Sequence, residues 1–78
     1  MISGSFLVKN MLSQTHIRQT ELAEKLNVTS ASISQRIKND SWKLQDLEAI
    51  SNILGFTLEM KLINKNGEYF VIKSGKND

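Results

Sequence analysis

The chain contains no cysteine, which excludes disulfide bonds and thiolate metal sites. His16 is the only histidine, and a metal site usually needs a second one, so we expect His16 to be a loop residue rather than a metal ligand. No apolar run approaches the ~18 residues of a membrane span, and the N-terminus lacks the pattern of a signal peptide. We therefore expect a soluble cytoplasmic protein with no membrane partner and no cofactor.

The sequence also offers little material for catalysis. It has no Gly-rich phosphate loop and no Ser/His/Asp or Cys/His arrangement, and its acidic residues are scattered. A chain of 78 residues forms one small domain, near the lower limit for a self-sufficient core, with little room for a substrate pocket. We expect no enzymatic activity.

Charge is unevenly distributed along the chain. The net charge of +2 argues only weakly for a nucleic-acid partner. Residues 1–43, however, carry six Lys/Arg against three acids, whereas residues 44–78 carry four lysines against five acids. The basic half contains the motif described next, which favours a DNA-binding surface there. Ordinary surface variation is the alternative explanation.

Residues 19–38 have the pattern of two short helices joined by a tight turn. Asn27 stands where the first helix must end, and Thr29 can cap the second. The apolar residues recur on one face of each helix: Leu22, Ala23, Leu26, Ile33 and Ile37. The remaining positions on the second helix are small or polar: Ser30, Ala31, Ser34, Gln35 and Lys38. Such a surface fits a DNA major groove and offers amide and hydroxyl groups to base edges.

On these residues the chain is similar to a known family. LAEKLNVTSASISQRI resembles the helix-turn-helix of the Xre/Cro family, the lambda-repressor-like domains of bacterial and phage regulators. LQDLEAISNILGFTLEMKL resembles the fourth helix of that family and the strand that follows it. The resemblance implies a mainly α fold, a four-to-five-helix lambda-repressor-like domain, here followed by a C-terminal β-hairpin. It also implies a DNA-binding transcriptional regulator.

The resemblance assigns roles to particular residues. Gln19 matches a glutamine that contacts phosphate, while Ser30, Ala31 and Gln35 align with positions that reach base edges. Gln35 is the strongest candidate, because its amide can pair bidentately with adenine. Further candidates for phosphate or base contacts are Thr29, Ser32, Ser34, Arg36 and Lys38. The alternative is that these residues only cover a solvated helix surface.

Two cations stand where the family usually has a capping hydroxyl. Arg18 precedes the second helix and Lys43 precedes the fourth, so each cap should be weak and each cation lies where a phosphate would bind.

We expect Ser5 to cap a first helix over residues 6–14, and Trp42 to fill the core rather than stack on a base. The fourth helix, residues 44–54, carries an apolar stripe: Leu44, Leu47, Ile50, Ile53 and Leu54.

From Thr57 the apolar period changes to two, and Asn66-Gly67 between two alternating runs predicts a β-hairpin. A two-residue or four-residue turn places on one face, packed on the helices, Leu58, Met60, Leu62, Tyr69 and Val71. The other face then carries Ile63, Phe70 and Ile72, which we expect to form a homodimer by edge pairing or face packing. Such a dimer would hold two recognition helices about one DNA turn, ~34 Å, apart. The alternatives are a monomer whose hairpin folds back, or one that binds a different protein.

The sequence thus predicts three segments: a helix-turn-helix domain (1–56), a β-hairpin (57–73) and a flexible tail (74–78). The expected function is a regulator, most simply a repressor, that binds double-stranded operator DNA as a homodimer with residues 30–38 in the major groove. The alternative is an antitoxin-like module whose hairpin binds a toxin or another protein, because the LEMKLI strand also resembles antitoxins with this domain.

Overall fold

A computed structural model describes residues 3–73 of the chain, so the predicted flexible tail lies outside the described residues. The helices are α1 (Gly4–Thr15), α2 (Gln19–Leu26), α3 (Ser30–Asn39) and α4 (Leu44–Ile53), and the antiparallel strands are β1 (Glu59–Ile63) and β2 (Tyr69–Lys73). The predicted architecture is confirmed, with four helices in this part of the chain. None of the helices within residues 3–73 is long and apolar enough to cross a membrane.

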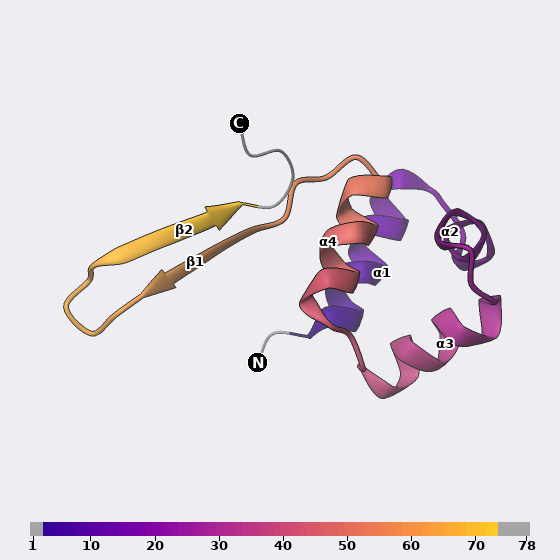
Figure 1. Cartoon of the computed structure of the whole chain (residues 1–78), viewed down its shortest axis with the longest axis horizontal. Coiled ribbons are helices and arrows are strands. Elements are labelled where there is room, and N and C mark those ends of the chain that lie inside the picture. Colours follow the sequence, from indigo (N-terminus) through magenta and orange to yellow (C-terminus); the bar gives the residue numbers. More distant parts are fainter. Residues whose placement is uncertain (1–2, 74–78) are drawn as a thin grey trace.

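The helices form one body from which the hairpin projects. In Figure 1, α1 and α4 lie in the middle, with α2 and α3 on one side and the hairpin reaching away on the other. The hydrophobic core is shared by all four helices: Val8, Met11, Leu12, Leu22, Ala23, Ile33, Ile50 and Leu54. Helices α2 and α3 and the hairpin are therefore at opposite ends of the molecule.

Two residues of the predicted α4 stripe are not in the core. Leu44 is 56% exposed and Ile53 is 38% exposed, so the predicted stripe faces the core only through its other members. Leu44 is the first residue of α4, and its side chain lines a groove with Met60 and Ile72 of the hairpin. This leaves an apolar side chain on the surface next to the strands.

The first helix begins earlier than predicted. Ser3, not Ser5, is the N-cap of α1, and its hydroxyl accepts a hydrogen bond from the Phe6 N–H at 3.2 Å. Ser5 lies inside the helix and is buried, because its side chain is used for contacts with the end of α3. The cap prediction failed because both serines have the right spacing for a cap and only the packing of α3 separates them.

The weak caps of α2 and α4 are strengthened by acids in their first turns. Glu21 Oε1 accepts a hydrogen bond from the Arg18 backbone N–H at 3.0 Å, and Asp46 Oδ2 accepts one from the Lys43 backbone N–H at 3.0 Å. A carboxylate also stabilises the positive end of the helix dipole. Arg18 and Lys43 can therefore replace capping hydroxyls while their cationic side chains stay exposed to solvent.

The hairpin register differs from the prediction. The Asn64 N–H donates to the Glu68 carbonyl at 2.9 Å, which leaves a three-residue loop that ends at Gly67 with a φ of +84°. An odd loop length moves β2 by one position, and a one-residue slip exchanges its two faces. Met60 pairs with Ile72 and Leu62 with Phe70. The predicted grouping of Ile63 with Phe70 and Ile72 is therefore wrong.

The strands also do not pack on the helices as predicted. Every residue of β1 and β2 is exposed, and the large apolar side chains among them are 37–62% accessible. Only the end of the hairpin nearest the helices approaches α4, where Leu44 and Glu48 line a groove with Met60 and Ile72. The hairpin is thus an arm with two solvent-facing sides (Figure 1).

Candidate nucleic-acid interface

The turn between α2 and α3 fixes the direction in which α3 leaves the core. Asn27 adopts the left-handed conformation with a φ of +59°, as predicted, and the Val28 N–H donates to the Ala23 carbonyl at 2.9 Å. Thr29 then caps α3, because its hydroxyl accepts from the Ser32 N–H at 3.1 Å. These local signals are all in the sequence, and they place the N-terminus of α3 at the surface.

Helix α3 buries one side and exposes the other. Ile33 is fully buried, and Ile37 packs against the core from one turn further along. The exposed positions on the opposite side are small, polar or basic: Ser30, Ala31, Ser34, Gln35 and Lys38. We call these five residues the outward face of α3. Ser32 lies at its margin and is half-buried.

The start of α2 meets the middle of α3 beside this face. The Ser34 hydroxyl donates to Gln19 Oε1 at 3.3 Å, so two residues fifteen positions apart in sequence lie together. Gln19 is the first residue of α2, where unpaired backbone N–H groups and the positive end of the helix dipole favour an anion. The amide of Gln19 keeps its two N–H donors for a phosphate, because the hydrogen bond with Ser34 uses its oxygen.

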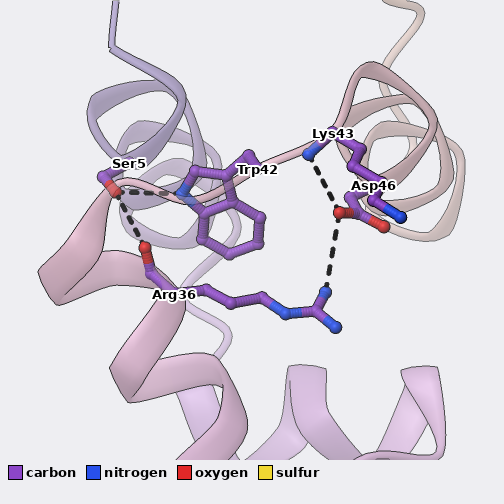
Figure 2. Close-up of polar contacts among 5 residues, drawn as sticks. All are labelled: Ser5, Arg36, Trp42, Lys43 and Asp46. Atoms are coloured by element: carbon purple, nitrogen blue, oxygen red, sulfur yellow. Dashed lines mark hydrogen bonds and ion pairs between the residues drawn. The ribbon is translucent and has the colours of Figure 1, made fainter.

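Arg36 does not belong to the outward face. Its guanidinium reaches α4 and forms an ion pair with Asp46 at 3.7 Å, and both side chains are about one-third exposed (Figure 2). Asp46 also holds the start of α4 through the Lys43 N–H. Arg36 therefore connects the recognition helix to α4, whereas Lys38, two residues later, remains exposed.

A second set of contacts holds the C-terminal end of α3. The buried Ser5 hydroxyl donates to the Ile37 carbonyl at 2.8 Å. It accepts from the Trp42 indole N–H at 2.9 Å and lies 3.5 Å from the Arg36 carbonyl, as Figure 2 shows. Trp42 is half-buried and packs against the core, as predicted, rather than standing free for base stacking. The outward face is thus presented by a helix that is fastened at its C-terminal end.

Asp40, directly after α3, extends this fastening to α1. Its carboxylate accepts hydrogen bonds from the Ser5 N–H at 2.9 Å and the Ser3 hydroxyl at 3.1 Å. The hydrogen bond from the Ser5 backbone is the largest of the effects that lower the pKa of Asp40 below its ordinary value. The sequence indicated a turn here but not this role, because the partner residues are more than thirty positions away.

Comparison with known proteins agrees with this geometry. Residues 8–59 match the family model described as the Cro/C1-type HTH DNA-binding domain, which is about two-thirds of the chain. The chain belongs to this family. No curated protein and no solved structure matches it.

Membership of the Cro/C1-type family makes the chain a DNA-binding protein with the features of a regulator. The matched residues begin inside α1, include the whole of α2, α3 and α4, and end at the first residue of β1. The rest of the hairpin therefore lies outside the family match, and its role must be argued from its own residues.

Proposed function

We propose that the chain is a sequence-specific transcriptional regulator that inserts α3, residues 30–38, into the major groove of an operator. The observation that supports this most directly is the outward face of α3, which is exposed, free of large apolar side chains and adjacent to Gln19. A helix of this composition can approach base edges closely, because no bulky residue holds it away from the groove.

The outward face can both read bases and bind the backbone. Gln35 can pair bidentately with adenine, and the Ala31 methyl can contact a thymine methyl. Cations at either side of the helix can neutralise phosphates, which positions the protein without reading sequence. The proposed contact residues are Arg18, Gln19, Thr29, Ser30, Ala31, Ser32, Ser34, Gln35, Lys38 and Lys43. Arg36 is left out of this set because it is paired with Asp46.

A single copy would bind weakly. Most of the side chains on the outward face are short, so bidentate contacts are few and much of the affinity is electrostatic. Specific affinities of ~10⁻⁸ M or tighter need more contacts than one such helix supplies. We therefore propose a homodimer on a palindromic operator, with half-sites one DNA turn of ~34 Å, or a multiple of it, apart. Occupying a promoter in this way represses transcription.

The test is selection of duplexes from a random pool at physiological salt, followed by sequencing. The proposal predicts an enriched palindrome. A Gln35→Ala variant should bind the selected site about 1–3 kcal/mol more weakly and lose preference at one position of each half-site. Asn52→Ala, which removes an exposed amide from α4, is the matched control and should select the same sequence as the wild type. If no sequence is enriched, specific operator binding is refuted.

A second candidate function is favoured by the exposed hairpin. Its apolar residues form a surface of the kind that binds proteins. In this alternative the chain is an antitoxin-like module, and the hairpin binds a toxin or another protein. The selection experiment separates the two, because a protein-binding module without operator specificity would enrich no palindrome.

A further inference from the structure

The two sides of the hairpin differ sharply in chemistry. One side consists only of apolar residues, with Met60 opposite Ile72 and Leu62 opposite Phe70. We call these four residues the apolar face. Each of them is 37–56% exposed although the hydrophobic effect favours their removal from water. They cover one whole side of the two strands and leave no polar residue on it.

The opposite side carries the charges and satisfies them within the hairpin. Lys73 Nζ lies 3.8 Å from Glu59 Oε2, and Lys61 Nζ lies 4.3 Å from the centre of the Tyr69 ring. Ile63 belongs to this side as well. Pairs of this kind are compatible with water, so the charges on this side need no partner. Val71 is exposed on this side too, but only the apolar face is without any charged residue.

The apolar face continues onto α4. A groove between α4 and the base of the hairpin is lined by Leu44, Glu48, Leu58, Met60 and Ile72. The exposed Leu44 side chain extends the apolar surface beyond the strands. The groove lies where the hairpin meets α4. The arm projects beyond it (Figure 1), and the pair Leu62 and Phe70 lies toward the turn at its free end.

We propose that a second copy of the chain covers this surface, so that the apolar faces of two hairpins pack against each other across a two-fold axis. In this arrangement Leu62 and Phe70 of each copy approach the other copy's groove beside Leu44. A two-fold axis requires a self-complementary surface, and a protrusion and a hollow on one continuous apolar surface meet that requirement. This inference rests on the homodimer of the proposed function and specifies which surface makes it.

The size of the surface fits a second copy. Leu44 and the four residues of the apolar face are 37–56% exposed, so at roughly 200 Å² for each large apolar residue they present roughly 500 Å² per chain. Two copies would bury roughly 1,000 Å² of apolar surface, which is near the lower limit for a specific interface. An isolated two-stranded hairpin is also only marginally stable, and a second hairpin packed on it supplies the missing contacts.

The charge of the hairpin favours a second copy over a nucleic acid or an anionic membrane. Residues 59–73 carry three lysines and two glutamates, so two hairpins do not repel each other strongly. Every charged residue of β1 and β2 lies on the side away from the apolar face. A partner that covers the apolar face therefore meets no charge from the strands, and Glu48 is the one charged residue that lines the adjoining groove.

The test is sedimentation of the chain without DNA over a range of concentrations. The wild type should reach twice its mass of 8.8 kDa. A Phe70→Lys/Ile72→Lys variant should need at least tenfold higher concentration to do so. The matched control is Tyr69→Lys/Val71→Lys, which makes the same change at neighbouring exposed positions on the other side and should dimerise like the wild type.

A third variant covers the possibility that lysines unfold the hairpin. Leu44→Asp changes the groove from α4, where an acid in the first turn is favourable to the helix, and it should weaken the dimer without altering the strands. The inference is overturned if the wild type is monomeric, or if the Tyr69/Val71 variant dissociates as much as the Phe70/Ile72 variant. It is also overturned if both the Phe70/Ile72 variant and Leu44→Asp keep the mass of the wild type. Because no DNA is present, a failure of operator binding would leave these results unaffected, and the two proposals fail separately.

Discussion

Ser5 joins three elements around the end of the recognition helix, and replacing it with alanine gives a sharp test of how α3 is held. The Ser5 hydroxyl is buried, donates to the Ile37 carbonyl at 2.8 Å and accepts from the Trp42 indole N–H at 2.9 Å. Ser5→Ala leaves both groups without this partner. At about 1 kcal/mol for each lost hydrogen bond, the free energy of unfolding should fall by about 2 kcal/mol.

In a domain of this size, 1 kcal/mol shifts the melting temperature by about 4–8 °C, so the expected loss is about 10 °C. Urea and thermal unfolding followed by circular dichroism at a helix band would measure it, since the backbone amides of the four helices dominate that signal. The matched control is Ser13→Ala, the same substitution at an exposed position of α1. Both variants gain the same small helix propensity, so their difference isolates the hydrogen bonds.

The stability of Ser5→Ala relative to that of Ser13→Ala decides whether the reasoning holds. If the stability of Ser5→Ala lies within about 0.5 kcal/mol of that of Ser13→Ala, as expected for surface substitutions, the hydroxyl does not fasten α3 and the reasoning is refuted. If the predicted loss is found, the same variant should also bind DNA more weakly near its melting range, because α3 is then held less firmly at its C-terminal end.

Four further substitutions test other parts of the account. Lys38→Ala should reduce the slope of log affinity against log salt concentration by about 0.9, the value for one phosphate contact, in anisotropy titrations with DNA. Arg36→Ala should leave this slope unchanged. It should lower the free energy of unfolding, measured in urea, by at most about 1 kcal/mol. Gly4→Ala should lower the melting temperature, because the added Cβ would lie 2.8 Å from Trp42 Cδ1 and force the packed indole to move. Asp40→Asn should be less stable than the wild type at neutral pH. The ordinary pKa of this carboxyl is 3.8 and folding lowers it, so the stabilisation is present above about pH 4 and is lost as the pH falls through the folded pKa. In acid the two proteins should therefore unfold alike, and a difference that persists there in circular dichroism would contradict this.

Local signals predicted most of the helical domain. Asn27 in the left-handed conformation and Thr29 as a cap each act through the few residues that follow them, so the turn before α3 was predictable from the sequence. The outward face of α3 was predictable for a similar reason, since Ile33 and Ile37 fix its phase. Helix periodicity determines which side of α3 is buried, whatever the rest of the chain does.

Long-range contacts were not predictable in the same way. Nothing near Arg36 in the sequence indicates that Asp46 will hold it, and Ser5 resembled a cap because its contacts with α3 are more than thirty positions distant. The hairpin shows a different limit. Asn66-Gly67 predicts a turn but not its length, and one residue more or less in the loop exchanges the faces of β2. The face on which Phe70 lies therefore depended on the hydrogen bond between Asn64 and Glu68.

The central claim is that the outward face of α3, together with the start of α2, binds DNA. The most direct test is a titration of ¹⁵N-labelled protein with a short duplex, followed by NMR chemical shifts of the backbone and side-chain amides. The claim predicts that the largest changes occur at residues 30–38 and at Gln19, with the Gln35 side-chain amide among them, and that residues 59–73 change little. If the changes are concentrated in the hairpin while α3 stays unperturbed, the claim is contradicted.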